Sequence, residues 1–266
     1  MSENGLAALR ADREEVLAVA RTLSPTEWTE PSDCAGWRVQ DVVNHMANVF
    51  RTFVDPGALA PGVPGKTEAT QDAAVAACKS WTSDRVLADY EDMSSKGLEA
   101  LAGLVTGPMA DTVVPLDDLG SHPLHRLANA LAFDHFCHLR NDILQPNGPV
   151  DRPPPPADAL RVGATIEWLV AGVPQMSPPS LAEGLDRPIS LRLTGAGGGE
   201  WTLRPGDRTR IEVVEGTSGD EAATITSPAT EFIIWATHRR PWRDREIAID
   251  GDAAAATRAL EAVHVF

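Results

Sequence analysis

The spacing of apolar residues changes partway along this chain, and a proline-rich segment marks the change. Before residue 145 apolar side chains recur at helical intervals, whereas ISLRLTG, GEWTLRP and RTRIEVVEG, beyond Pro188, alternate apolar with polar residues. Between the two patterns lies Arg152-Pro153-Pro154-Pro155-Pro156, and four consecutive prolines favour a stiff, extended spacer. The sequence therefore predicts an α domain over residues 1–150 and a second domain over residues 157–266.

The first part is expected to contain four main helices and two long loops. The helices are expected at residues 4–22, 39–53 and 82–104 and in the string LANALAFDHFCHLRNDIL, with a short helix at 69–80. Ser121 is expected to cap the helix in that string, with Pro123 in its first turn. Loops are expected at 55–66 and 107–120. This order suggests a four-helix bundle, a fold in which facing helices build metal sites.

The second part reads as α+β. A helix is expected at residues 157–173, and strands follow in the alternating segments, in AATIT and in REIAID. Two further helices are expected at 228–237 and 252–263. The glycine-rich run 195–199 lies between two strands and no helix follows it, so it predicts a hairpin loop rather than a nucleotide-binding loop.

Charge and composition exclude several classes of partner. The formal net charge of −15 argues against nucleic acid or an anionic membrane, because both need a basic surface. No stretch approaches about 18 uninterrupted apolar residues, so no membrane span is expected. The N-terminus lacks the features of a signal peptide. Three cysteines (Cys34, Cys78 and Cys137) cannot form a disulfide framework, which favours a reducing cytoplasm.

Three side chains could share a ligand. Asp134 and His138 are four residues apart and fall on one face of a helix, while His45 lies in another helix. If the helices pack side by side, one carboxylate and two imidazoles converge, which suits a catalytic divalent metal with an open position. The alternatives are a hydrogen-bonded histidine at a helix seam and a surface i,i+4 pair. His135 and Asp142 are further candidate ligands.

The residues around His45 also match a known signature. The chain has Glu27-Trp28, then Cys34-Ala35-Gly36-Trp37, then Asp41-Val42-Val43-Asn44-His45-Met46. This order resembles the opening signature of the mycothiol-dependent maleylpyruvate isomerase family. The segment 134–142 is similar to the family's Glu-x-x-x-His-x-x-Asp helix, and residues 227–242 with Gly251-Asp252 resemble its C-terminal domain.

This resemblance implies both a fold and an activity. The N-terminal domain would be a DinB-like four-helix bundle that binds a divalent metal, usually zinc, through His45, Asp134 and His138. The C-terminal domain would be sterol-carrier-like. The cofactor would be mycothiol, the small thiol of actinobacteria, and Arg239 corresponds to an arginine implicated in activity. We expect Arg239 to bind the cofactor or substrate, and Trp37 to line the site.

The expected function is that of a mycothiol-dependent isomerase or S-transferase. A metal-bound thiolate would attack a small electrophile, and acidic compounds are among the candidate substrates. The alternatives are a non-catalytic small-molecule-binding protein on the same scaffold and a metal-dependent hydrolase. Cys34 is expected to pack as a small apolar residue in the loop before the His45 helix.

The chain departs from the family pattern at three places. Asp134 stands where the family has Glu, so its helix must sit closer, or a water must bridge, or the metal is weakly bound or absent. His238 replaces the Gly that precedes Arg239. Asp142 follows His138 by four residues rather than three.

Overall fold

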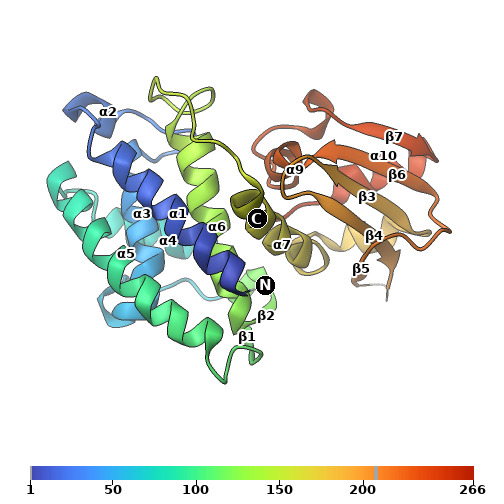
Figure 1. Cartoon of the computed structure of the whole chain (residues 1–266), viewed down its shortest axis with the longest axis horizontal. Coiled ribbons are helices and arrows are strands. Elements are labelled where there is room, and N and C mark those ends of the chain that lie inside the picture. The colour runs from blue at the N-terminus through green and yellow to red at the C-terminus, as the bar shows by residue number, and fades with distance from the viewer. Residues whose placement is uncertain (1, 207–208) are drawn as a thin grey trace. The chain divides into compact units, whose positions relative to one another are not determined.

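Contacts between residues divide the chain into a helical unit and a unit built on a β-sheet. The structure is a computed structural model that describes residues 2–206 and 209–266. The first unit comprises the residues up to Asp118 together with His122–Pro156, and the second comprises Leu119–Ser121 and Ala157–Phe266. In Figure 1 the first unit consists mainly of helices, and the second unit contains a sheet together with helices. The expected fold class, α followed by α+β, is confirmed.

Four helices of the first unit pack along one another (Figure 1). They are α1 (Ser2–Ala20), α3 (Val39–Val54), α5 (Ser83–Thr106) and α6 (Leu127–Cys137), with the shorter α2 (Pro25–Thr29) and α4 (Thr67–Ala77) beside them. These bounds agree with the ranges expected from apolar spacing to within a few residues. Throughout residues 2–206 and 209–266, no helix combines the length and apolar character that crossing a membrane requires.

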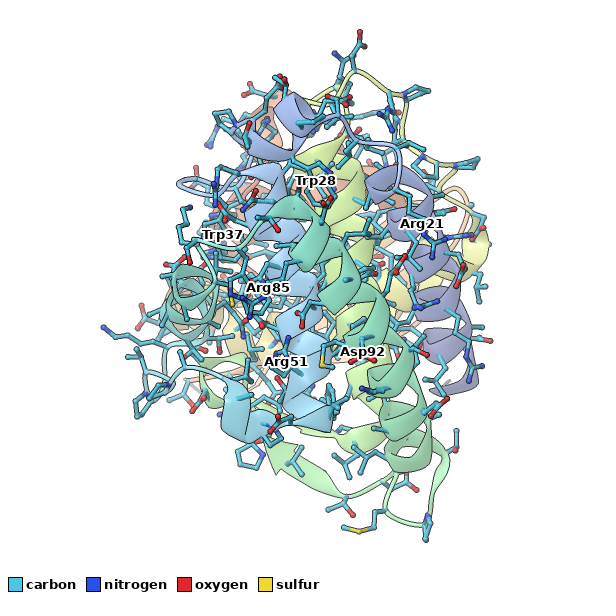
Figure 2. The ribbon with its side chains drawn as sticks, turned by 90° about the vertical axis from the view of Figure 1, so that its left-hand side faces the viewer. Arg21, Trp28, Trp37, Arg51, Arg85 and Asp92 are labelled. Atoms are coloured by element: carbon cyan, nitrogen blue, oxygen red, sulfur yellow. The ribbon has the colours of Figure 1, made fainter. Side chains whose placement is uncertain are left out.

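Helices α3 and α5 make the most extensive contact in this unit. Phe50 of α3 and Tyr90 of α5 are fully buried between them, and Arg51 forms an ion pair with Asp89 at 2.6 Å. Figure 2 shows Arg51 on α3, beside the ribbon of α5 that crosses the front of the view. A side chain at Gly97 would meet Phe50, because an added Cβ would lie 2.5 Å from the ring. The absence of a side chain at Gly97 therefore sets how closely the two helices approach.

The prediction that Ser121 caps the helix carrying Asp134 and His138 is wrong. Residues 121–123 form a short strand, β2 (Ser121–Pro123), that pairs with β1 (Val113–Pro115), so the segment 107–120 is not a simple loop. The amides of Leu124 and His125 then donate to the carbonyls of Thr112 and Ala110 at 3.0 and 2.8 Å. The backbone groups that a helix start would use are thus already paired, and α6 begins at Leu127 after one 3₁₀ turn.

The helix that carries Asp134 and His138 is not uniform. From His138 to Ile143 it becomes a π-helix, in which the amide of Leu144 donates to the carbonyl of Leu139, five residues earlier, at 3.1 Å. Apolar spacing predicted one continuous α-helix here. A π-turn contains one more residue than an α-turn.

The second unit is a five-stranded sheet with helices packed on it (Figure 1). The strands are β3 (Ile189–Thr194), β4 (Gly199–Pro205), β5 (Ile211–Glu215), β6 (Ala223–Pro228) and β7 (Ala248–Gly251), in the order β5-β4-β3-β6-β7. Only β3 and β6 pair in parallel among these neighbours. The helices are α7 (Ala159–Met176), α8 (Pro179–Gly184), α9 (Ala229–Ala236) and α10 (Ala253–Ala262), of which α8 was not expected.

The glycine-rich run is a hairpin loop, as expected. It joins the antiparallel strands β3 and β4, with Leu193 paired to Gly199. Gly195 and Gly197 have φ values of 85° and 73°, a left-handed conformation that glycine adopts without steric cost. The core beneath the sheet is formed by buried side chains of its central strands and of α9, among them Leu191, Ile225 and Phe232.

Replacement of Gly97 by alanine is expected to destabilise the first unit by about 1–3 kcal/mol, because the added methyl group overpacks against Phe50. Gly103 lies in the same helix, and an added Cβ there would meet no atom within 4 Å. Gly103→Ala is therefore a matched control and should stabilise by roughly 0.5–1 kcal/mol. Urea unfolding of both variants measures the difference. Equal changes in the free energy of unfolding would contradict the packing argument.

Candidate metal centre

Three side chains from α3 and the end of α6 meet at one point. His45 Nε2 lies 2.9 Å from Asp134 Oδ1, and His138 Nε2 lies 3.4 Å from the same oxygen. One ligand atom from each of the three residues lies within 4.8 Å of the others. His45 is only 5% exposed, so it faces the interior. The expected convergence of His45, Asp134 and His138 is thus confirmed as geometry.

The donor set fits a divalent metal. Two imidazoles and one carboxylate form the N₂O set of several catalytic zinc sites, and zinc–ligand bonds of about 2.1 Å place tetrahedral donors about 3.4 Å apart. The Nε2–Oδ1 distances of 2.9 and 3.4 Å are close to that value. Within the described part of the chain, Asp134 Oδ2 and His45 Nδ1 are buried without a hydrogen-bond partner. Asp134, although shorter than Glu, reaches both imidazoles.

The electrostatics of the three residues suit a cation between them. Burial alone would raise the pKa of Asp134, but the two neighbouring histidines outweigh it and hold that pKa well below the usual range. Burial alone would lower the pKa of His138, but the Asp134 charge and the hydrogen bonds to His138 hold it well above the usual range. The half-buried carboxylate of Asp134 thus draws positive charge to this point, and either a proton or a metal ion supplies it.

The opposite edge of the His138 ring is held by Asp142. His138 Nδ1 lies 2.7 Å from Asp142 Oδ2, and Asp142 is 2% exposed. A carboxylate in this place fixes the tautomer and orientation of a metal-binding histidine, leaving Nε2 free to bind. Asp142 follows His138 by one residue more than in the family pattern. The π-helix accommodates that residue, and the carboxylate still reaches the ring.

His45 is positioned by the start of α3. Asp41 accepts hydrogen bonds from the amide of Arg38 at 2.8 Å and from its guanidinium, and the Lys79 ammonium lies 2.6 Å away. Burial alone would raise the pKa of Asp41, but the bonds from Arg38 and Lys79 outweigh it and lower that pKa. The aspartate of the signature therefore anchors the helix that carries His45, and we assign it no chemical step.

Trp37 lies against the two histidines. Its ring centroid is 5.1 Å from that of His45 and 6.4 Å from that of His138. The indole N–H donates to Asp72 of α4 at 2.9 Å, and Figure 2 shows Trp37 on the side of the unit where α4 lies. The ring is thus held beside the candidate metal centre, which is the position expected of a residue that lines the site.

His135 is not a member of the set. Its ring packs against Phe50 and Tyr90, and its Nδ1 donates to the carbonyl of Leu131 at 2.9 Å. Burial lowers the pKa of His135 to about 4, so the ring is neutral near pH 7. Of the two further candidates, His135 is a core residue and Asp142 contacts the site through His138.

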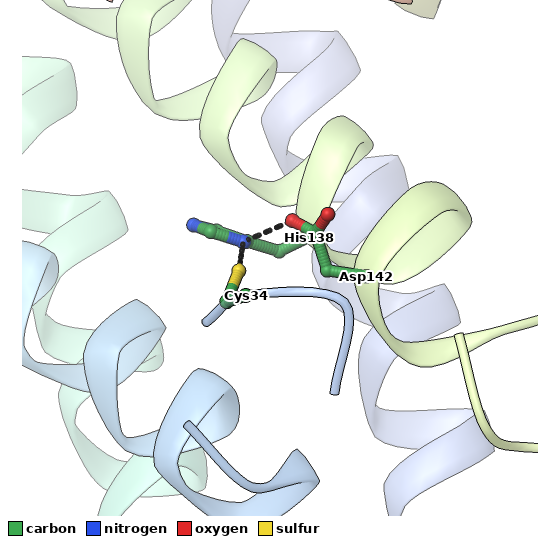
Figure 3. A group of neighbouring side chains, drawn as sticks. All are labelled: Cys34, His138 and Asp142. Carbon is green, nitrogen blue, oxygen red and sulfur yellow. Dashed lines mark hydrogen bonds and ion pairs between the residues drawn. The ribbon is translucent and has the colours of Figure 1, made fainter. Parts of the chain in front are cut away.

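The expected apolar role of Cys34 is wrong. Its side chain is half-buried, and its Sγ lies 3.7 Å from His138 Nδ1, beside Asp142 (Figure 3). The position of the cysteine within the signature was the available signal. Sequence spacing could not place the loop against His138, because a contact across 104 positions depends on tertiary structure.

Arg239 lies in the second unit, after α9. Its guanidinium donates to Thr237 Oγ1 at 3.2 Å, and its amide donates to the carbonyl of Ile234 at 3.1 Å. The preceding residue, His238, has a φ of 52°, the left-handed conformation that glycine adopts readily. The His238 ring stacks on His264 at 3.9 Å and donates to the carbonyl of Val263 at 3.1 Å. These contacts hold a non-glycine residue in that conformation.

Comparison with known families decides the relationship. Residues 9–141 match the sequence model of the mycothiol maleylpyruvate isomerase N-terminal domain. The chain belongs to this family. The matched segment contains His45, Asp134 and His138, and the sequence resemblance is confirmed.

Solved structures agree with the mycothiol maleylpyruvate isomerase family at the level of fold. The chain is similar to the crystal structure of the mycothiol-dependent maleylpyruvate isomerase, with a TM-score of 0.56 and 16% identity over 94% of this chain and 93% of that one. A histidine-to-alanine mutant of that isomerase gives a TM-score of 0.54, with the same identity and coverage. The comparison with curated proteins finds no match.

Asp134→Glu is expected to bind zinc as well as the natural chain or better, because the longer side chain restores the family's ligand. Asp134→Asn is the control, since it keeps the shape but removes the charge, and it should lower zinc content. Metal analysis after dialysis against a defined zinc concentration measures both. Loss of zinc from Asp134→Glu alone would show that the site is built around the shorter side chain.

Proposed function

We propose that this protein is a divalent-metal-dependent, mycothiol-dependent isomerase of a small acidic electrophile. Maleylpyruvate, on which the similar isomerase acts, is the first substrate to test. The observation that carries the proposal is the meeting of His45, Asp134 and His138 within 4.8 Å, in a chain of this family. An S-transferase would share the first step, attack of a thiolate on the electrophile, but would keep the adduct as its product.

His45, Asp134 and His138 would hold the metal, most simply zinc. The bound ion supplies a Lewis acid that favours the thiolate of mycothiol over its thiol at neutral pH. Three protein ligands would leave one position for that sulfur. Asp142 orients His138 through Nδ1, and the Asp134 carboxylate offsets part of the positive charge.

Trp37 would present an apolar wall beside the sulfur. Its half-buried ring lies against the two histidines, and the hydrogen bond to Asp72 holds the indole in place. A wall of this kind limits the access of water to the reacting atoms. Arg239 would bind a carboxylate of the substrate, because its forked guanidinium matches carboxylate geometry.

The proposal is tested by isomerisation of maleylpyruvate with purified, zinc-loaded protein, with and without mycothiol. Turnover should require both zinc and the thiol, and His45→Ala should lower it by at least about 100-fold, since loss of partners outside the ligand shell already costs 10–100-fold. His125→Ala is the matched control, because His125 pairs with the exposed Asp111 and lies outside the set. Hydrolysis of the substrate without the thiol would contradict the proposal and would show that the protein is a metal-dependent hydrolase. Zinc binding without turnover would favour a binding protein.

The role of Arg239 is tested beside two neighbouring arginines. Arg239→Ala should reduce thiol-dependent turnover mainly by raising KM for the acidic substrate, while Arg240→Ala and Arg243→Ala should leave it near that of the natural chain. Arg243 pairs with Glu261, and Arg240 donates to the carbonyl of Arg239, so each has a local structural partner. Zinc content and unfolding temperature serve as controls for folding. Equal tolerance of the three changes would remove Arg239 from the reaction.

A further inference from the structure

A second group of ligands lies on the other edge of the His138 ring. Cys34 Sγ, His138 Nδ1 and Asp142 Oδ2 all lie within 4.8 Å of one another (Figure 3). We propose that these three atoms form a second, thiophilic site for a divalent cation such as Zn²⁺, Co²⁺ or Cd²⁺. This site differs from the N₂O set in its sulfur ligand, and it does not depend on the proposed enzymatic activity.

The distances fit such an ion. Zinc–sulfur and zinc–nitrogen bonds of about 2.3 and 2.1 Å at a tetrahedral angle separate the two donors by about 3.6 Å. Cys34 Sγ and His138 Nδ1 are 3.7 Å apart. Asp142 Oδ2 lies 2.7 Å from the same nitrogen and is therefore within reach of an ion bound there after a small outward shift. A thiolate and a carboxylate together would balance the charge of a divalent cation.

The loop that carries Cys34 is fastened to this position by its backbone. The amide of Asp33 donates to the carbonyl of Asp142 at 3.0 Å, which ties the loop directly to the π-helix. Ser32 Oγ accepts from the amide of Cys34 at 3.2 Å, and the amide of Trp37 donates to the carbonyl of Cys34 at 3.0 Å. Gly36, with a φ of 80°, closes the turn. The thiol is therefore held beside His138 by bonds on both sides of Cys34.

The two sites compete for one histidine. A neutral imidazole has a single lone pair for a metal, because its other nitrogen carries the proton. When Nε2 binds an ion with His45 and Asp134, the Nδ1 proton is donated to Asp142. When Nδ1 binds an ion with Cys34, the proton moves to Nε2 and is donated to Asp134, and the Cys34 thiol releases its own proton to solvent. The chain should therefore hold one ion per His138, distributed between the two sites.

Cobalt reports the sulfur ligand directly, because thiolate coordination gives an intense near-ultraviolet charge-transfer band that nitrogen and oxygen ligands do not give. Purified full-length protein, free of added thiol, is titrated with Co²⁺. The natural chain should show the band and bind one ion. Cys34→Ser should lose the band, and Cys78→Ser, which changes another half-buried cysteine, should keep it. Asp134→Asn disables the first site and should strengthen the band.

A second measurement keeps the test valid if Cys34→Ser does not fold. In the natural chain, Cd²⁺ should slow alkylation of Cys34 by iodoacetamide while that of Cys78 is unchanged, as read by mass spectrometry. Absence of the cobalt band in the natural chain, or its persistence in Cys34→Ser, would overturn the second site. The proposed function fails separately, through loss of thiol-dependent turnover with the cobalt band intact.

Discussion

A half-buried carboxylate between two histidines is the interaction on which the arrangement of this unit depends. An unpaired carboxylate away from water is costly, so Asp134 requires positive charge close by. His45 from α3 and His138 from the end of α6 provide the nearest groups, at 2.9 and 3.4 Å. The packing of α3 against α5, with Gly97 admitting Phe50, keeps the His45 helix in register. The same packing of α3 against α5 therefore forms part of the core and positions His45 in the candidate metal centre.

The signature around His45 separates into residues with different physical roles. Gly36 supplies the left-handed turn, and Asp41 anchors the start of α3 to Arg38 and Lys79. Val42 is buried in the core, whereas His45 faces the centre itself. The motif thus contains one ligand of the candidate metal centre, His45, and one of the proposed second site, Cys34, and other residues of the motif hold these two in position.

Much of this structure could be predicted from the sequence, and the exceptions have physical causes. The i,i+4 spacing of Asp134 and His138, and the alternation in the strands, follow from local geometry, so both were predictable. The start of α6 was not, because the backbone of residues 124–125 pairs with a distant segment. The contact of Cys34 with His138 was missed for the same reason. Whether Arg239 and Trp37 act on a substrate or cofactor stays a prediction.

The π-turn after His138 shows how a helix can absorb an insertion without losing a contact. An additional residue in a regular α-helix rotates everything beyond it by about 100°, which would change the contacts of every later residue. Widening one turn confines the change to six residues, His138–Ile143. Relatives with two or three residues between this histidine and aspartate can therefore conserve the same bond. A search that requires one fixed gap would separate proteins that share the site.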